Sequence, residues 1–341
     1  MKTALVVRYG AFGDNLLITP VFKKLKELGY YVIVDTTERG REVFANNPNI
    51  DKITDRVTDS VPLKDIDKEW NRQKEEYKPD YYKNFSESLE VSIALHPRSP
   101  MYTYPKRERE GRCNVNYYDH TEKWADLGPL YKRGELFFTD EEEAIARGYL
   151  RKSKFNLLWC LSGSGKNKAY PWSDYVIGEI LKNHKNIHVI TVGDLRCQLL
   201  ESLNDKDITN LSGKIPIRVS MALTKFCDLV ISPDTGILHA AGCFTVPKIG
   251  LLGHSTKENI TKYFDNDHSI EAKCECAPCY RLIYDHNIQC PVDPVTHACW
   301  CMAKGIDPKD VYAKFQEVHD DWLMSNMYEG QKDVSGIKVG S

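Results

Sequence analysis

Residues 4–14 read Ala-Leu-Val-Val-Arg-Tyr-Gly-Ala-Phe-Gly-Asp, an apolar run typical of a buried strand that leads into a glycine turn. Apolar residues then recur at helical spacing from Ile18 to Leu28, and Gly29 ends this predicted helix. The next apolar run covers residues 31–34. Because unbroken apolar strands alternate with a helix, this order predicts a parallel sheet covered on both faces, the doubly wound α/β fold.

The alternation of strand and helix begins again at residue 155. We expect strands at 155–160, 188–192, 228–232 and 248–252, and helices at 140–152, 175–184, 219–226, 236–243 and 307–324. This predicts two Rossmann-like domains, 1–150 and 151–328, followed by a frayed tail, 329–341. Residues 60–130 are expected to form loops and short helices. A ligand cleft is expected between the domains, at the carboxyl ends of the strands.

The composition excludes several classes of protein. The 341 residues carry 46 Lys and Arg against 48 Asp and Glu, a net charge of −2, with 42% hydrophobic residues. This balance gives no global electrostatic reason to bind nucleic acid, so a nucleic-acid partner is not expected. The sequence contains neither a signal-peptide core nor about 18 consecutive apolar residues. We therefore predict a cytoplasmic protein without a transmembrane segment.

The glycine turn is the first candidate site. Gly10 and Gly13 allow the backbone to approach a ligand, and Asp14 adds a carboxylate at the start of the following helix. The dinucleotide fingerprint Gly-x-Gly-x-x-Gly is not met, because the glycine spacing differs and Asp14 would repel a pyrophosphate. Asp14 therefore suits a general base or a helix N-cap, and an NAD-dependent oxidoreductase is disfavoured.

Two further motifs follow predicted strands of the second domain. In one, Thr235 and Gly236 can bind a phosphate at a helix start, and His239 can add a hydrogen bond or a charge. Alternatively, Asp234 is the helix N-cap and His239 a buried, hydrogen-bonded imidazole. In the other, residues 163–168 form either an anion-binding loop or a solvated turn, and they do not match the P-loop pattern.

Together these motifs resemble glycosyltransferase family nine, known for ADP-heptose:lipopolysaccharide heptosyltransferases. The resemblance rests on residues 5–20, on Lys168 with Pro171-Trp172, on Leu211-Ser212-Gly213, on Asp234-Thr235-Gly236-x-x-His239, and on residues 247–253. It spans most of the chain, and residues 55–135 match least. Gly10 is a departure, because family members often carry a small hydroxylated residue there.

The resemblance implies a GT-B architecture with an N-terminal acceptor domain and a C-terminal donor domain. It further implies inverting, metal-independent transfer of a heptose or related sugar from a nucleotide-diphosphate donor, with ADP favoured, to a hydroxyl of a glycan, a protein or another acceptor. By similarity, Asp14 would be the general base. The donor-binding residues would be Gly163, Ser164, Lys168, Lys214, Ile215, Asp234, Thr235, Gly236 and His239. Catalysis would need no cofactor, because helix N-termini and a lysine can stabilise the departing diphosphate.

The acceptor side is less defined by the sequence. The candidate acceptor-binding residues are Gly10, Gly13, Arg112 and His120, and the last two lie in a stretch rich in Tyr, Arg and Lys that puts a lipid A-core acceptor in doubt. A charged run such as 106–110 is more often a solvated helix face. The Asp-x-Asp at 65–67 matches a metal-binding tripeptide, but such tripeptides are common in charged stretches.

Six of the eleven cysteines lie between residues 274 and 301. In a long chain without a signal sequence, this clustering indicates a thiolate metal site or a local covalent clasp rather than a secreted disulfide scaffold. Cys276 and Cys279 have the spacing of two ligands of one zinc or iron ion, and Cys290 and Cys299 would complete a closed structural site. The competing ligands are Cys274, Cys301, His286 and His297. Reduced or disulfide-paired cysteines without a metal are the alternative.

A non-catalytic binding protein on the same scaffold is the second class of function that the sequence allows. It would recognise a nucleic acid or a protein partner through the cysteine segment and the Tyr- and Arg-rich stretch. The presence of Asp14, Lys168 and His239 favours the enzyme.

Overall fold

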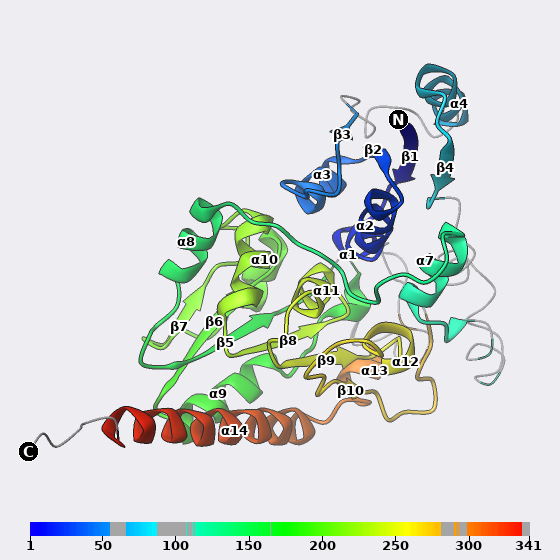
Figure 1. The fold of residues 1–341 in the computed structure, drawn as a ribbon. Helices are drawn as coiled ribbons and strands as arrows, with labels where there is room; N and C mark the ends of the chain where they lie inside the picture. The colour runs from blue at the N-terminus through cyan, green and yellow to red at the C-terminus, as the bar shows by residue number, and fades with distance from the viewer. Residues whose placement is uncertain are drawn as a thin grey trace, which may run out of the picture.

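The computed structural model describes residues 1–54, 66–86, 107, 111, 113–163, 165–280, 290, 292 and 299–335, and it contains two parallel β-sheets (Figure 1). The first sheet has the order β3-β2-β1-β4, with bounds Lys2–Arg8 for β1, Tyr30–Thr36 for β2, Lys52–Ile53 for β3 and Tyr81–Asn84 for β4. The second has the order β10-β9-β8-β5-β6-β7, with bounds Phe155–Cys160 for β5, Ile187–Val192 for β6, Ile208–Asn210 for β7, Leu229–Pro233 for β8, Lys248–Leu252 for β9 and Ile270–Glu271 for β10.

Helices connect the strands and cover the sheets. In the first half they are α1 (Phe12–Leu16), α2 (Thr19–Glu27), α3 (Glu38–Phe44), α4 (Ile66–Tyr77), α7 (Tyr117–Ala125) and α8 (Asp140–Gly148). In the second half they are α9 (Ser173–Asn183), α10 (Ile217–Phe226), α11 (Gly236–Gly242), α12 (Lys257–Ile260), α13 (Trp300–Ala303) and α14 (Pro308–Ser335), with short 3₁₀ helices at Lys166–Lys168 and Leu195–Leu200. In the described part of the chain, none of the helices combines the length and the apolar composition that crossing a bilayer requires.

Strand β5 explains why the second sheet is apolar at almost every position. Phe155 and Trp159 pack with α9 and α14 on one face, whereas Leu158 packs with α10 and α11 on the other, and all three side chains are fully buried. Successive residues of a strand point to opposite faces. Because both faces are covered here, β5 shows no alternation of apolar and polar residues. The cluster around Leu158 continues through α11 to Val6 in β1, so the two sheets share one apolar core.

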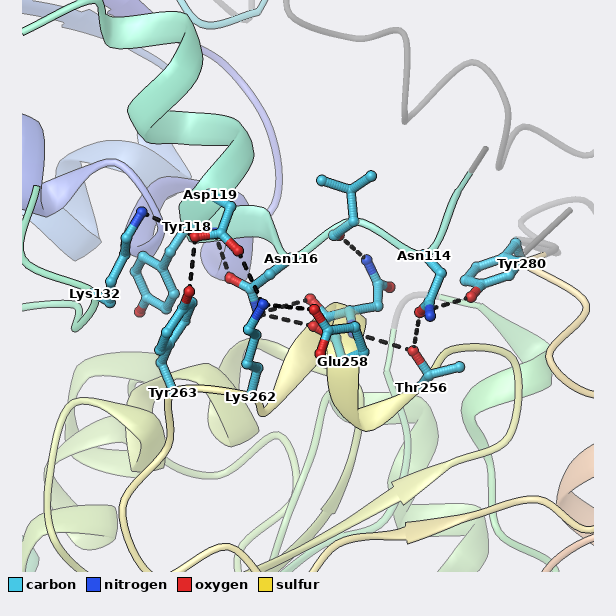
Figure 2. A network of polar contacts seen from close by, with 12 residues as sticks. Asn114, Asn116, Tyr118, Asp119, Lys132, Thr256, Glu258, Lys262, Tyr263 and Tyr280 are labelled. Carbon is cyan, nitrogen blue, oxygen red and sulfur yellow. Dashed lines mark hydrogen bonds and ion pairs between the residues drawn. The ribbon is translucent and has the colours of Figure 1, made fainter. Parts of the chain in front are cut away.

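The segment 113–125 lies against α12 of the second half through a network of polar contacts (Figure 2). The Nδ2 of Asn116 donates to the carbonyl oxygen of Glu258 at 3.0 Å, and the Nδ2 of Asn259 donates to that of Val115 at 2.6 Å. The hydroxyl of Tyr263 donates to Asp119 at 2.9 Å. At its other end α7 contacts β4, where the indole nitrogen of Trp124 donates to the carbonyl oxygen of Asn84. Helix α7 therefore bridges the two halves.

The predicted α/β fold is confirmed, and the strand predictions at 155–160 and 248–252 match β5 and β9 at both ends. Strand β4 was not predicted, because its sequence Tyr-Tyr-Lys-Asn forms a sheet edge and lacks an apolar run. The glycine turn is shorter than expected, since α1 already begins at Phe12. The closing helix continues to Ser335, so the predicted start of a frayed tail at residue 329 falls inside α14; residues 325–335 contain no proline to end it.

Candidate active site

A cleft of about 1250 Å³ is lined by residues from both halves of the chain. From the first half come the residues that follow β1 and β2 and one side of α7; from the second come the residues that follow β5, β8 and β9. The carboxyl ends of parallel strands therefore meet in one cavity, as the sequence predicted. The predicted site residues that line it are Gly10, Gly13, Asp14, His120, Gly163, Lys168, Ile215, Asp234, Thr235, Gly236 and His239.

Asp14 is held in the cleft by its own helix and by Arg8. Its Oδ2 accepts a hydrogen bond from the backbone N–H of Ala11 at 2.8 Å, and its Oδ1 lies 3.2 Å from a guanidinium nitrogen of Arg8. Arg8 is buried and also donates to the carbonyl oxygen of Phe85 at 2.6 Å. The N-cap of α1 is Ala11, so Asp14 caps from the first turn and not from the N-cap position. Its side chain is still 43% exposed, which leaves it accessible from the cleft.

The glycines of the motif are required by close contacts. Gly10 has a φ of +150°, and a Cβ there would lie 2.8 Å from the Oδ2 of Asp14. A Cβ on Gly13 would lie 2.6 Å from the His239 ring, and a Cβ on Gly236 would lie 2.7 Å from that of Phe12. Two glycines thus allow α1 to pack directly on the start of α11. This contact brings the carboxylate of the first half to the motif of the second.

Asp234 is the centre of a buried charged group. Its Oδ1 lies 3.2 Å from the Nε2 of His239, and its Oδ2 lies 3.3 Å from the Nε2 of His254 and 3.8 Å from the Nζ of Lys168. Burial opposes ionisation, but Lys168 and the hydrogen bonds from the two histidines outweigh it and hold the pKa of Asp234 well below its usual value. The alternative of Asp234 as N-cap is wrong, because Thr235 caps α11 by accepting from the N–H of Leu238.

The loop after β5 completes this side of the cleft. A Cβ on Gly163 would lie 2.8 Å from carbon atoms of both Lys168 and Thr235, so this glycine lets the loop close on them. Ser164 lies outside the described residues. Lys168 ends the 3₁₀ helix Lys166–Lys168, and its side chain is only 12% exposed. Lys168 is therefore mostly buried, which contradicts the alternative of a solvated turn with surface lysines at this position.

Val192, Gly213, Ile215 and Ile217 also line the cleft, together with Asp194 and Arg196. Lys214 does not line it, because its Nζ donates to the carbonyl oxygen of Asn210 at 2.8 Å and the residue is exposed. On the opposite wall, His120 lines the cleft together with Tyr117 and Thr121 of α7. Arg112, Asp65 and the candidate metal ligands His286 and His297 lie outside the described residues.

The cysteine cluster forms on the outer side of the second sheet, near α13. The sulfur atoms of Cys274, Cys276 and Cys301 all lie within 4.8 Å of one another, with Cys276 at 3.5 Å from Cys274 and 3.3 Å from Cys301. A hydrogen bond from Cys301 lowers the pKa of Cys276 to about 6. This group shares Cys276 with the predicted set of Cys276, Cys279, Cys290 and Cys299 and adds the competing candidates Cys274 and Cys301. Cys301 also interacts with Cys279 and Cys299. Spacing alone could not favour Cys301 over the other candidates, because α13 brings it back over the turn at 274–276.

Arg8 and His254 are among the polar residues of the cleft that were not predicted as site residues. Arg8 is the last residue of β1, and His254 follows β9 by two residues. Both stand at the carboxyl ends of parallel strands, so the rule that predicted the other site residues could also have found them.

Comparisons with known proteins point to one family of glycosyltransferases. Residues 121–284 match the model of glycosyltransferase family 9 (heptosyltransferase). The chain is 23% identical over 296 residues, 79% of this chain and 84% of the relative, to the lipopolysaccharide core heptosyltransferase OpsX of Haemophilus influenzae.

Solved structures share the fold. The structure of E. coli ADP-heptose lps heptosyltransferase II is 16% identical and covers 93% of this chain and 98% of its own, with a TM-score of 0.61. The bacterial iron-containing dodecameric glycosyltransferase TibC from enterotoxigenic E. coli is 13% identical and covers 94% and 77%, with a TM-score of 0.60. The E. coli heptosyltransferase WaaC with ADP is 14% identical and covers 93% and 99%, with a TM-score of 0.56. These neighbours have the GT-B fold, in which two Rossmann-like domains face a cleft. The match over residues 121–284 and this shared fold identify glycosyltransferase family 9 as the family that the chain resembles, and together they indicate a glycosyltransferase.

Proposed function

We propose that this protein transfers a heptose or a related sugar from an ADP-linked donor to an acceptor hydroxyl with inversion at the anomeric carbon. One observation carries the proposal: the contact between α1 and α11 brings Asp14 into the same cleft as Lys168 and the buried Asp234 group. A base and a cationic anion-binding site facing one cavity are what a single displacement at an anomeric carbon requires.

Asp14 accepts the proton of the acceptor hydroxyl as the oxygen attacks the anomeric carbon. The bond between that carbon and the diphosphate oxygen breaks, and the nucleoside diphosphate leaves with the electron pair. Arg8 and the N–H of Ala11 fix the carboxylate, so no reorientation is needed during the reaction. Gly10, Gly13 and His120 line the same cleft and form its acceptor side.

Lys168, Thr235 and the backbone of Gly163 and Gly236 stabilise the diphosphate as its charge develops. His239 supports this site by holding Asp234, whose remaining lone pairs accept from sugar hydroxyls, and the nucleobase lies along Ile215. Ser164 completes the donor set by family resemblance. The residues of β5 to α14 form the donor domain and those before β5 the acceptor domain, with the boundary near residue 150. The cytoplasmic location stays a prediction.

Replacement of the base tests the mechanism. We expect Asp14→Asn to bind donor almost normally and to lose about a hundred- to ten-thousand-fold in transfer rate, because only proton removal is lost. Calorimetry with the donor and a mass-spectrometric transfer assay measure the two effects. The matched control is Asp51→Asn, which removes a carboxylate from the outside of the first half. An Asp14→Asn enzyme that keeps most of its activity would disprove the role of Asp14.

The donor is tested with ADP-, UDP-, GDP- and CDP-sugars in the absence of acceptor. Selective calorimetric binding of an ADP-sugar, with slow hydrolysis detected by mass spectrometry, is expected. The acceptor is a glycan, a protein or another hydroxyl compound, and the same assay with candidate acceptors distinguishes these. Equal binding of all four nucleotides, or of none, would contradict the ADP preference.

We also propose that the cysteine cluster holds one structural iron or zinc ion. Four thiolates around one such ion lie about 3.8 Å apart at tetrahedral geometry, and the described sulfur separations of 3.3 to 3.5 Å are close to this. Cys274, Cys276 and Cys301 supply three ligands, and Cys279, Cys290 or Cys299 supplies the fourth. The ion orders the loop against α13 and takes no part in the transfer, because four protein ligands close the site.

Metal analysis of the purified protein is expected to give one equivalent of iron or zinc, and Cys301→Ser is expected to lose it together with thermal stability. The control is Cys227→Ser, a buried cysteine that packs in the other apolar cluster. Full metal content in Cys301→Ser, or none in the wild type, would contradict the proposal.

A further inference from the structure

His254 enters the cleft from the loop after β9 and is almost fully buried. No part of the proposed mechanism uses it. Its Nε2 lies 3.3 Å from the Oδ2 of Asp234, and this is the same carboxylate oxygen that faces Lys168. Two donors therefore compete for one oxygen.

The distances show which donor is nearer. The Nζ of Lys168 lies 3.8 Å from the Oδ2 of Asp234, beyond a direct hydrogen bond, whereas His254 is close enough to hold that oxygen. His239 holds the other oxygen, Oδ1, at 3.2 Å. With each oxygen held by an imidazole, the carboxylate does not draw the ammonium group of Lys168 fully onto it.

The loop that carries His254 is fixed from two sides. The backbone N–H of Tyr280 donates to the carbonyl oxygen of His254 at 2.8 Å. The hydroxyl of Tyr280 donates to the Oδ1 of Asn114 at 3.0 Å, and Thr256 donates to the same oxygen (Figure 2). A Cβ on Gly253 would lie 2.4 Å from the sulfur of Met302, so the loop also packs tightly against α13. These contacts preorganise the imidazole toward Asp234.

We propose that His254 is a positioning residue of the donor site: by occupying the Oδ2 of Asp234, it keeps Lys168 available for the diphosphate of the donor. The inference rests on the proposed function, since it requires a diphosphate in this cleft. When His254 is removed, Lys168 closes onto the buried carboxylate, and the diphosphate loses its main cationic partner. The nucleoside part of the donor lies at the other end of the cleft and is unaffected.

The experiment compares the binding of ADP and of adenosine to the full-length protein by calorimetry. We expect His254→Leu to weaken ADP binding about tenfold, the worth of one hydrogen bond to a charged group, with adenosine binding unchanged. His254→Gln is expected to restore ADP binding, because its amide N–H can donate to Asp234. His268→Leu is the matched control, since this histidine lies outside the cleft and faces Glu317 on α14.

A double-mutant cycle with Lys168→Met identifies the path of the effect. We expect His254→Leu to weaken ADP binding little further once Lys168 has been removed. Additive losses from the two substitutions, equal losses for ADP and adenosine, or normal ADP binding by His254→Leu would each overturn the inference. If the wild type binds no ADP at all, the proposed function fails instead, so the two failures are distinguishable.

Discussion

At the scale of single residues, the candidate site depends on its glycines as much as on its polar side chains, because a glycine leaves space for a neighbouring group. Gly13 leaves the space that the His239 ring occupies, and Gly236 leaves the space beside Phe12. Gly10 has a left-handed backbone and lies against the Asp14 carboxylate. A hydroxylated side chain, as often found there in family members, would have to displace Asp14 in this chain.

Gly13→Ala tests the contact between α1 and α11. The added Cβ would lie 2.6 Å from a carbon of His239, so we expect an overpacking cost of about 1–3 kcal/mol in the free energy of unfolding. Transfer activity should fall as well, because Asp14 follows Gly13 in the same turn. Urea denaturation measures the first effect and a transfer assay the second.

Gly178→Ala is the matched control for this change. Gly178 lies inside α9, and a Cβ there would meet nothing within 4 Å, so we expect a small gain in stability of about 0.5–1 kcal/mol. If Gly13→Ala were as well tolerated as Gly178→Ala, this result would contradict close packing between α1 and α11.

At the scale of elements, α7 is the clearest case of a short helix placed by both halves. Asn116 caps α7 by accepting from the N–H of Tyr118, and its Nδ2 donates to the carbonyl oxygen of Glu258. The same helix carries Tyr117, His120 and Thr121 on the wall of the cleft. The polar network with α12 therefore holds one wall of the cleft to the second half of the chain (Figure 2).

Asn116→Ser separates these two roles, because serine keeps the N-cap but cannot reach the partner carbonyl. Since Asn116 is buried, we expect a loss of about 1–2 kcal/mol in the free energy of unfolding and faster hydrogen exchange in residues 113–125. Thr139→Ser, which changes the exposed N-cap of α8, should leave both quantities nearly unchanged. Equal behaviour of the two variants would mean that the bridge adds no stability.

At the scale of the whole molecule, buried histidines couple stability to pH. His188 in β6 lies between Asn156 and Thr209, and burial, assisted by Arg151 and Lys154, lowers its pKa from 6.5 to about 4. Burial also lowers the pKa values of His184 and His319. His319 stacks on Phe315 of its own helix α14, and His184 meets His319 edge to face. All three histidines therefore favour the neutral form in the folded state.

The sign of the resulting pH dependence follows from these shifts. As the pH falls below 6.5, the unfolded chain takes up a proton at His188 while the folded chain does not until about 4. The free energy of unfolding should therefore decrease between pH 6.5 and pH 4, by about 2–3 kcal/mol from His188 alone. Urea denaturation at pH 7 and pH 5 measures the decrease. His188→Gln should flatten the profile, and an unchanged slope in that variant would contradict this origin.

The sequence by itself determined the fold class, most of the strands and the loops that line the cleft. These follow from local rules: apolar runs predict strands buried on both faces, and the carboxyl ends of parallel strands meet at one edge. The family resemblance, carried by the motifs around Asp14 and Asp234, was visible at the same level and is confirmed by the comparisons.

Only the tertiary structure decided which partners meet across long sequence separations. Strand β4 forms by pairing with β1 at the edge of the first sheet, although its own sequence has little strand pattern. Cys301 joins Cys274 and Cys276, and His254 joins Lys168 at Asp234, through packing that spacing does not encode. The physical reason is that these contacts depend on how whole helices and sheets pack, and packing is set by the complete core and not by any local pattern.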